Sequence, residues 1–150
     1  MLVLEAKLKG TSEQYAILDE MIRTARFIRN SCVRYWMDNR DVGKNEISAY
    51  TAILAAQYEW ASKLNSMARQ ASGERAWQSI NRFYSNCKKK IPGKKGYPKF
   101  RRQQTHGSVE YKTTGYKLSE DRRSISFIDK FKAGTFKMWG TRDLHGYQLS

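Results

Sequence analysis

The sequence predicts an α+β fold in which a helical segment is inserted into a small sheet or barrel. Apolar and polar residues alternate before residue 10 and again after residue 108, which is the period of half-buried strands. Between residues 11 and 88, apolar residues recur every three or four positions, as in amphipathic helices. A single early strand is not stable alone, so it must pair with the late strands. The helices therefore interrupt one sheet.

The first strand is predicted over residues 2–9, with alternate side chains from Leu2 to Leu8 on one face and Gly10 as its end. Thr11 and Gln14 then fit a capping box at the start of a long helix. The apolar stripe of this helix consists of Leu18, Ile22, Ala25, Ile28, Cys32 and Trp36. An arginine face lies between these positions and is a candidate binding surface: Arg23, Arg26, Arg29 and Arg34.

Two further helices and several short strands complete the prediction. The helices cover residues 48–64 and 66–87, and Gly73 costs the second about 1 kcal/mol relative to alanine. Trp77 would offset this cost by packing on the first helix. Strands are predicted over residues 108–111, 116–118, 125–128 and 135–139. Turn-forming residues separate Leu118 from Ile125, so we expect a hairpin there.

The most informative stretch is residues 88–102 (KKKIPGKKGYPKFRR), in which eight of fifteen residues are Lys or Arg and none is acidic. Pro92 and Gly93 stop the preceding helix, so we expect an irregular cationic loop. A solvated linker would gain nothing from Tyr97 and Phe100, whereas a nucleic-acid groove uses cations for phosphates and rings for bases. We therefore predict nucleic-acid contact. The candidate residues are Lys88, Lys89, Lys90, Lys94, Lys95, Tyr97, Lys99, Phe100, Arg101 and Arg102.

The composition also favours a polyanionic partner. The 150 residues carry a net charge of +14, and a charge this large repels itself unless a polyanion compensates it. Hydrophobic residues make up 40 % of the chain, which is enough for a core and excludes a disordered tail. No basic amphipathic helix and no membrane-length apolar run is present, and Glu5 and Lys7 interrupt any signal peptide. We expect no membrane binding and a cytoplasmic location.

No set of residues predicts catalysis or metal binding. Asp121, Asp129 and Asp143 lie in turn-like sequence, without a rigid framework to bring their carboxylates together as a two-metal nuclease requires. Cys32 and Cys87 fall at apolar helix positions, so we expect buried free thiols. They form no zinc motif with the two isolated histidines. We predict no catalytic residue, metal or cofactor on this chain.

Three stretches resemble the N-terminal part of the TnpB (OrfB) family of insertion-sequence transposases, which act as RNA-guided DNA endonucleases. They are ARFIRNSCVRYW in the first helix, the GKKGYPKFRR box, and SVEYKTTGYKLSEDRRSISFIDKFKAGTFKMWGTRDLHGY in the strand region. The most specific element is GYPKFR, because a basic run closed by Gly, an aromatic, Pro, a basic residue and Phe is rarer than a generic basic patch. The resemblance covers nearly the whole chain.

The resemblance implies a wedge-like antiparallel β-barrel of the oligonucleotide-binding type, formed by residues 1–10 and 91–150. A three-helix recognition lobe would be inserted over residues 11–90. The implied partners are a guide RNA and double-stranded target DNA with a short flanking motif, in a bacterial cytoplasm. The family's RuvC-type carboxylates and zinc-binding insert lie downstream of this region. We therefore expect this chain to bind nucleic acid without cleaving it.

The resemblance also assigns individual residues. Gln70 would touch the flanking motif, and Ser48 and Tyr50 would lie in a neighbouring contact segment, although composition alone makes all three ordinary surface residues. Tyr111 would contact RNA or the guide–target duplex, as would residues 88–102.

Two other functions stay open. The helices over residues 48–64 and 66–87 could form a helix-turn-helix that binds duplex DNA without RNA, although the turn at Asn65 and Ser66 lacks the usual glycine. Sequence-specific binding in the absence of RNA would favour this regulator. A nuclease in its own right would show metal-dependent cutting that is lost in Asp129→Ala or Asp143→Ala.

Overall fold

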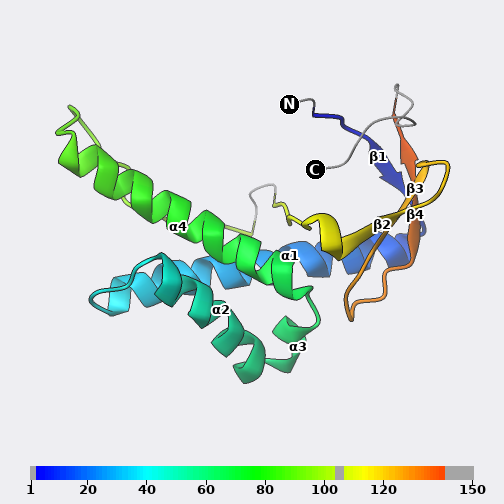
Figure 1. The fold of residues 1–150 in the computed structure, drawn as a ribbon, viewed down its shortest axis with the longest axis horizontal. Helices are drawn as coiled ribbons and strands as arrows, with labels where there is room; N and C mark the ends of the chain where they lie inside the picture. Colours follow the sequence, from blue (N-terminus) through cyan, green and yellow to red (C-terminus); the bar gives the residue numbers. More distant parts are fainter. Residues whose placement is uncertain (1–2, 104–106, 141–150) are drawn as a thin grey trace.

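The fold is α+β, with the helices inserted between the first strand and the others. The computed structural model describes residues 3–103 and 107–140. Figure 1 shows the strands gathered at one end of an elongated molecule, beside the start of the first helix. The elements are β1 (Lys7–Lys9), α1 (Ser12–Asp38), α2 (Lys44–Gln57), α3 (Glu59–Ser62), α4 (Ser66–Lys88), the 3-10 helix η1 (Thr113–Gly115), β2 (Tyr116–Leu118), β3 (Ser124–Phe127) and β4 (Thr135–Trp139).

The strands form one antiparallel sheet in the order β1-β4-β3-β2. Leu8 pairs with Met138, which confirms that the early strand joins the late ones. Leu118 pairs with Ile125, which confirms the predicted hairpin. Within the described residues the sheet is open, with β1 and β2 at its edges, and does not close into a barrel.

The first turn of α1 fixes the helices to the sheet. The capping box forms as predicted: the Gln14 N–H donates to Thr11 Oγ1 (3.2 Å) and the Thr11 N–H donates to Gln14 Oε1 (2.9 Å). Gln14 Nε2 then donates to the carbonyl oxygens of Ala133 (2.8 Å) and Thr135 (3.1 Å). One side chain thus caps α1 and also holds the start of β4.

Helices α1, α2 and α4 enclose the main apolar core. Gly73 allows α2 to approach α4 closely, because a Cβ at this position would lie 2.7 Å from Thr51 Cγ2. The predicted cost of Gly73 in helix propensity is therefore accompanied by close packing of α2 against α4. Trp77 is half-buried against the apolar core. The fully buried core side chains of the three helices include Met21, Ile28, Cys32, Val33, Ile47, Leu54 and Ile80.

The predicted bounds of the second helix are wrong at both ends. The helix begins at Lys44 because Gly43 is its N-cap and Glu46 Oε2 accepts a hydrogen bond from the Gly43 N–H (2.9 Å). It ends at Gln57 because Tyr58 is extended, with φ −121° and ψ 109°. The remaining predicted turns form the separate short helix α3.

Two predicted strands and one cysteine also differ from expectation. Only Lys7–Lys9 of the predicted strand 2–9 pairs in the sheet, residue 2 lying outside the described part. Residues 108–111 form no strand, since Arg75 Nη1 of α4 donates to Ser108 Oγ (2.7 Å) and the segment lies along that helix. Cys32 is buried, and burial raises its pKa to about 12, but Cys87 is exposed near the end of α4.

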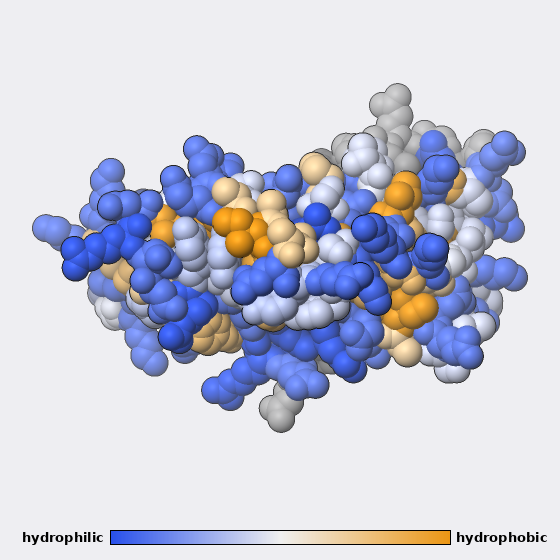
Figure 2. All heavy atoms as spheres, turned by 90° about the horizontal axis from the view of Figure 1, so that it is seen from below, coloured by the Kyte–Doolittle hydropathy of each residue, from blue (hydrophilic) through white to orange (hydrophobic). Residues whose placement is uncertain are grey.

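The outer face of α2 and α3 is mainly hydrophilic. Figure 2 views the molecule from this side and shows separate small apolar patches surrounded by polar side chains. Scattered apolar residues are normal on a protein surface and do not mark a docking site. None of the described helices is both long and apolar enough to cross a bilayer.

Candidate functional site

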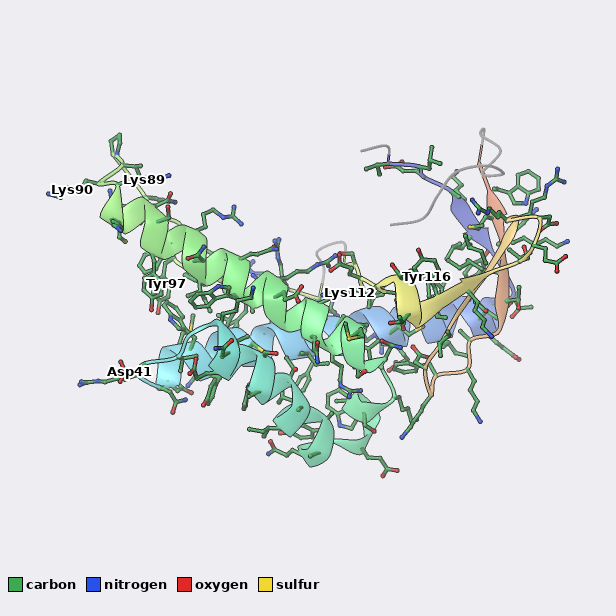
Figure 3. The ribbon with its side chains drawn as sticks, in the orientation of Figure 1. Asp41, Lys89, Lys90, Tyr97, Lys112 and Tyr116 are labelled. Atoms are coloured by element: carbon green, nitrogen blue, oxygen red, sulfur yellow. The ribbon has the colours of Figure 1, made fainter. Side chains whose placement is uncertain are left out.

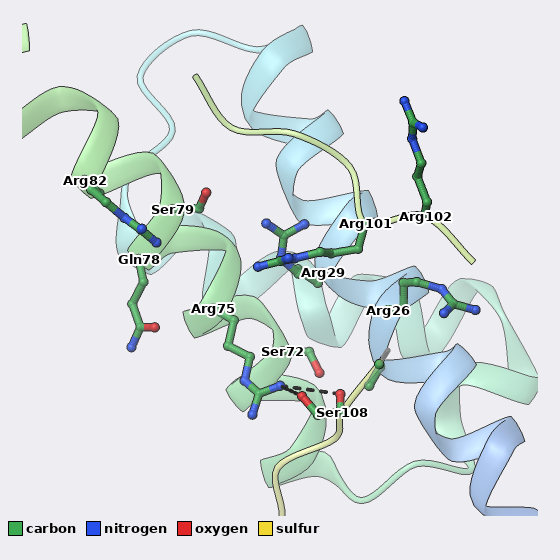
Figure 4. Close-up of a pocket in the computed structure, with 12 residues that line it drawn as sticks. Arg26, Arg29, Ser72, Arg75, Gln78, Ser79, Arg82, Arg101, Arg102 and Ser108 are labelled. Carbon is green, nitrogen blue, oxygen red and sulfur yellow. Dashed lines mark hydrogen bonds between the residues drawn. The ribbon is translucent and has the colours of Figure 1, made fainter. Parts of the chain in front are cut away.

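A groove of about 370 Å³ lies between α1, α4 and the chain that follows α4. Figure 4 shows its side chains, which come from one face of each helix and from two short stretches of the following chain. The groove is lined by Ala25, Arg26, Arg29, Ser72, Arg75, Gln78, Ser79, Arg82, Arg101, Arg102, Gly107 and Ser108.

Arginine dominates this groove. Six of the twelve lining residues that the structure describes are arginines, and none of the twelve is acidic. The nearest acidic residue in sequence, Glu74, is paired instead with Lys112, whose Nζ lies 2.9 Å from Glu74 Oε1. The positive charge of the groove is therefore not neutralised by a carboxylate on its wall. An arginine fork matches the geometry of a phosphate or carboxylate ligand.

Arg29 is the buried member of this set, with 9 % of its surface exposed. Its Nη1 donates to the carbonyl oxygen of Lys99 (3.0 Å) and to Asn30 Oδ1 (3.2 Å), both of which are uncharged acceptors. Burial lowers the pKa of Arg29, and the nearby guanidinium groups of Arg101 and Arg75 lower it further. A bound anion would reduce the repulsion between these guanidinium groups, so the electrostatics of the groove favour anion binding.

Asn30 fixes the following chain to α1. Its Nδ2 donates to the Arg101 carbonyl oxygen (2.9 Å), while its Oδ1 accepts from the Arg101 N–H (2.8 Å). Pro98 is fully buried beside this anchor. Further along, a Cβ at Gly107 would lie 2.4 Å from Ile22 Cγ2, so the backbone there approaches α1 closely. These contacts form one wall of the groove.

An aromatic pocket of about 550 Å³ lies between the end of α1, the α1–α2 connection and α4. Trp36 is its fixed member, because its Nε1 donates to Tyr84 Oη (2.7 Å). The Tyr97 ring lies 5.5 Å from the Trp36 ring and 5.1 Å from the Phe83 ring, centroid to centroid. Tyr84 and Tyr97 are nevertheless about half exposed, at 46 % and 52 %. Stacking surface thus remains open to solvent.

The structure divides the predicted basic stretch into two parts. Lys88, Lys89, Lys90 and Lys94 are exposed at the far end of α4, where Lys89 and Lys90 extend away from the helices (Figure 3). Lys95 Nζ donates back to the Ile91 carbonyl oxygen. Arg101 and Arg102 line the groove, Tyr97 lines the aromatic pocket, and Lys99 and Phe100 are exposed between them.

The residues assigned by the family resemblance lie on α4, on α2 and in the chain between α4 and η1. Gln70 is exposed in the second turn of α4, and Ser48 is exposed on α2. Tyr50 is half-buried and stacks on Tyr35, with ring centroids 4.2 Å apart. Tyr111 donates its hydroxyl to Asp129 Oδ2, and burial together with this hydrogen bond raises its pKa. Both tyrosines are less exposed than Tyr97.

The carboxylates of Asp121 and Asp129 each accept hydrogen bonds from groups close to them, in sequence or in the fold. Asp129 accepts from Tyr111 and from the Phe131 N–H (3.0 Å), as in a local turn. The exposed Asp121 accepts from Ser119, which lowers its pKa. Among the described residues there is no group of three or more His, Cys, Asp or Glu side chains suited to a metal ion. Asp143 lies outside the described part of the chain.

Half of the predicted arginine face of α1 belongs to the groove. Arg26 and Arg29 line it, whereas Arg23 pairs with Glu20 and Arg34 with Asp38, each at 2.8 Å. The α4 contribution was not predicted, although Arg75, Gln78, Ser79 and Arg82 follow helical spacing on one face. The lack of acidic residues on this polar face of α4 was the feature of the sequence that could have identified it as part of the site. No feature of the sequence around Asn30 indicated its contact with Arg101.

Comparison of the chain with family models and with curated proteins finds no match.

Proposed function

We propose that this chain binds nucleic acid and that the arginine groove holds the phosphate backbone. The observation that carries the proposal is a groove with six arginines and, among its described lining residues, no carboxylate. Guanidinium groups bind phosphate oxygens through two parallel N–H···O bonds, which fixes geometry as well as charge. The net charge of +14 favours a polyanion over a small anionic metabolite, because many phosphates are needed to compensate it.

We extend the proposal to a TnpB-like module that binds guide RNA and target DNA with a flanking motif. The support is that all three stretches carrying the resemblance meet at the groove. ARFIRNSCVRYW supplies Arg26, Arg29 and Asn30, and GKKGYPKFRR supplies Arg101 and Arg102. The third stretch supplies Ser108. An oligonucleotide-binding wedge barrel would need strands in addition to the four described, so it remains part of this proposal. The proposed mechanism is binding without bond breaking.

A helix-turn-helix that works without RNA is less well supported. In such a protein the N-terminal residues of α4 would enter the major groove. Here Asn65 Nδ2 donates to the Ile128 carbonyl oxygen (2.7 Å) next to β3, and Arg69 Nη1 donates to the Ser62 carbonyl oxygen (3.2 Å). Two polar groups at this helix start therefore serve internal contacts, although Gln70 stays exposed.

The testing experiment is a salt series on the full chain, with labelled single-stranded RNA and duplex DNA of random sequence. Six groove contacts predict that log K falls with log salt at a slope of roughly −5 for duplex and −4 for single strands. A slope near zero would overturn the phosphate-groove proposal. RNA that co-purifies from the native host then tests the extension: one structured RNA from the gene's own flank supports it, and bulk RNA in proportion to abundance contradicts it.

A further inference from the structure

We propose that the aromatic pocket binds an unpaired base of the same strand whose phosphates lie in the arginine groove. This inference rests on the proposed function and narrows its ligand to nucleic acid with a single-stranded segment. The pocket is formed by the rings of Trp36, Phe83, Tyr84 and Tyr97. Stacking of bases on such rings is a recurrent way of binding single strands.

The pocket is preformed. The hydrogen bond from Trp36 Nε1 to Tyr84 Oη holds two of the rings, and edge-to-face contacts hold Phe83 against both Trp36 (6.2 Å) and Tyr97 (5.1 Å). Tyr97 is anchored from the other side, because the next residue, Pro98, is fully buried. Rings that are already ordered lose little entropy when a base stacks on them.

The pocket and the groove are adjacent along two segments of the chain. On α4, Arg82 lines the groove, and Phe83 and Tyr84, which project from other faces of the same helical turn, line the pocket. In the following chain, Tyr97 and Arg101 are four residues apart, so their Cα atoms are separated by at most roughly 14 Å. Asn30 holds the Arg101 backbone on α1 at this point. A strand with phosphates in the groove can therefore reach the pocket within a few nucleotides.

The chemistry of the pocket favours a base over a cationic ligand. Aromatic cages that bind methylated ammonium groups use similar rings. Among its described lining residues, however, this pocket has one cation, Arg40, and one carboxylate, Asp41, so it lacks the net negative charge that would favour a cationic ligand. The lysines at the tip of α4, which are close in sequence to Tyr84 and Tyr97, add positive charge nearby. Asn39 and Asp41 on the same wall offer acceptors for the amino groups of a base edge.

A paired base cannot enter this pocket. Bases of a duplex are stacked and paired, and they reach a protein ring only when unstacked or flipped out. The occupant we infer is therefore a base of a single strand, a loop or a displaced strand. The duplex parts of the ligand would contact the protein through their backbone alone.

The test uses the full chain and fluorescence anisotropy with two single-stranded DNA probes of equal length, one of thymidines and one with abasic sites at internal positions. Tyr97→Leu removes the ring but keeps apolar contact with Trp36 and Phe83. We expect it to weaken binding of the thymidine strand about 5- to 100-fold, leaving abasic-strand affinity and salt slope unchanged. Trp139→Leu is the control, because Trp139 is exposed on β4 at the other end of the molecule.

Three outcomes would overturn the base pocket. Equal loss on both probes would make Tyr97 a structural residue, and no loss on either would mean that bases do not stack there. If Tyr97→Leu weakens the binding of a trimethyllysine peptide but changes the affinity for the two DNA probes equally, the pocket is assigned to a cationic ligand. Failure of the groove gives a different result, namely a flat salt response of the wild-type protein, so the two proposals are tested separately.

Discussion

The lysine-rich tip and the arginine groove are two positively charged regions that differ in how their charges are held. The tip, defined by Lys88, Lys89, Lys90 and Lys94, has exposed side chains at the end of α4. Lys90 and Gly93 there adopt positive φ angles of 52° and 82°, as expected of a tight irregular turn. The groove instead takes its arginines from one face each of α1 and α4 and from a segment fixed by Asn30.

Under the proposed function, this difference would make local charge density a poor guide to the binding site. An exposed lysine is strongly hydrated and loses rotamer entropy when it binds, so its net contribution is small. A partly buried guanidinium such as Arg29 is already desolvated and oriented by the Lys99 carbonyl oxygen. Ligand binding at the groove therefore requires less reorganisation than binding at the tip.

The largest predicted effect is the loss of affinity when two charges are removed from the groove, compared with the removal of two charges from the tip. Arg75→Gln with Arg101→Gln should weaken binding of random single-stranded RNA by roughly 10- to 100-fold and reduce the salt slope by about 1.4. Lys89→Gln with Lys90→Gln removes the same charge from the tip and should weaken binding less than about threefold. Anisotropy titrations at several salt concentrations measure both quantities.

The matched charge change makes this comparison sharp. Equal losses for the two double variants would mean that total charge, and not the groove, determines affinity. A larger loss at the tip would reverse the comparison between the two regions. Thermal unfolding of both variants is the control. We expect little change for the lysine variant and a loss of about 1 kcal/mol for the arginine variant, because Arg75→Gln removes the hydrogen bond to Ser108.

A smaller effect is predicted for Asn30→Ala, which leaves every charge in place. The variant loses two hydrogen bonds to the Arg101 backbone, so residues 101 and 102 should detach from α1, while Arg29 still holds the Lys99 carbonyl oxygen. We expect the free energy of unfolding to fall by about 1–2 kcal/mol and the affinity for RNA to fall several-fold. Asn81→Ala is the control, because Asn81 is exposed on α4. Hydrogen exchange at the Arg101 amide would report the detachment directly.

The result for Asn30 separates rigidity from charge. If affinity stays at the wild-type value while the Arg101 amide loses protection, then an unanchored arginine serves as well as an anchored one. The contrast between tip and groove would then depend on residue type, arginine against lysine, and not on orientation.

The sequence predicted those parts of the fold that depend on local chemistry. The capping box of Thr11 and Gln14 and the hairpin between Leu118 and Ile125 were found because their partners are close in sequence. Residues 108–111 were predicted as a strand because periodicity does not reveal which neighbour a segment will have. Their neighbour is α4, through Arg75 and Ser108, which are 33 residues apart.

The candidate site was predicted only in part for the same reason. The charge of Arg101 and Arg102 and the ring of Tyr97 identified the segment, and Arg26 and Arg29 belonged to a face already considered. The contact that creates the groove joins Asn30 to Arg101 across 71 residues, and no local pattern indicates it. Helix packing then places the α4 arginines opposite α1, which a charge profile along the chain does not show.

The smallest predicted effect distinguishes the groove from the start of α4. Gln70 and Gln78 are both exposed on α4, but only Gln78 lines the groove. In the TnpB-like proposal Gln70 reads the flanking motif, since glutamine can bond an adenine edge through two hydrogen bonds. Gln70→Ala should therefore reduce the preference for the motif by about fivefold and leave affinity for random duplex unchanged.

The motif for this measurement is first selected from a randomised duplex library with the wild-type chain and its co-purified RNA. Gln78→Ala should behave in the opposite way, with a loss of about twofold on every sequence and an unchanged preference. Equal loss on all sequences for Gln70→Ala would make it a structural residue. If the wild-type complex selects no motif, the start of α4 does not read DNA. The arginine groove would still stand on its own salt dependence, because phosphate contacts carry affinity without sequence information.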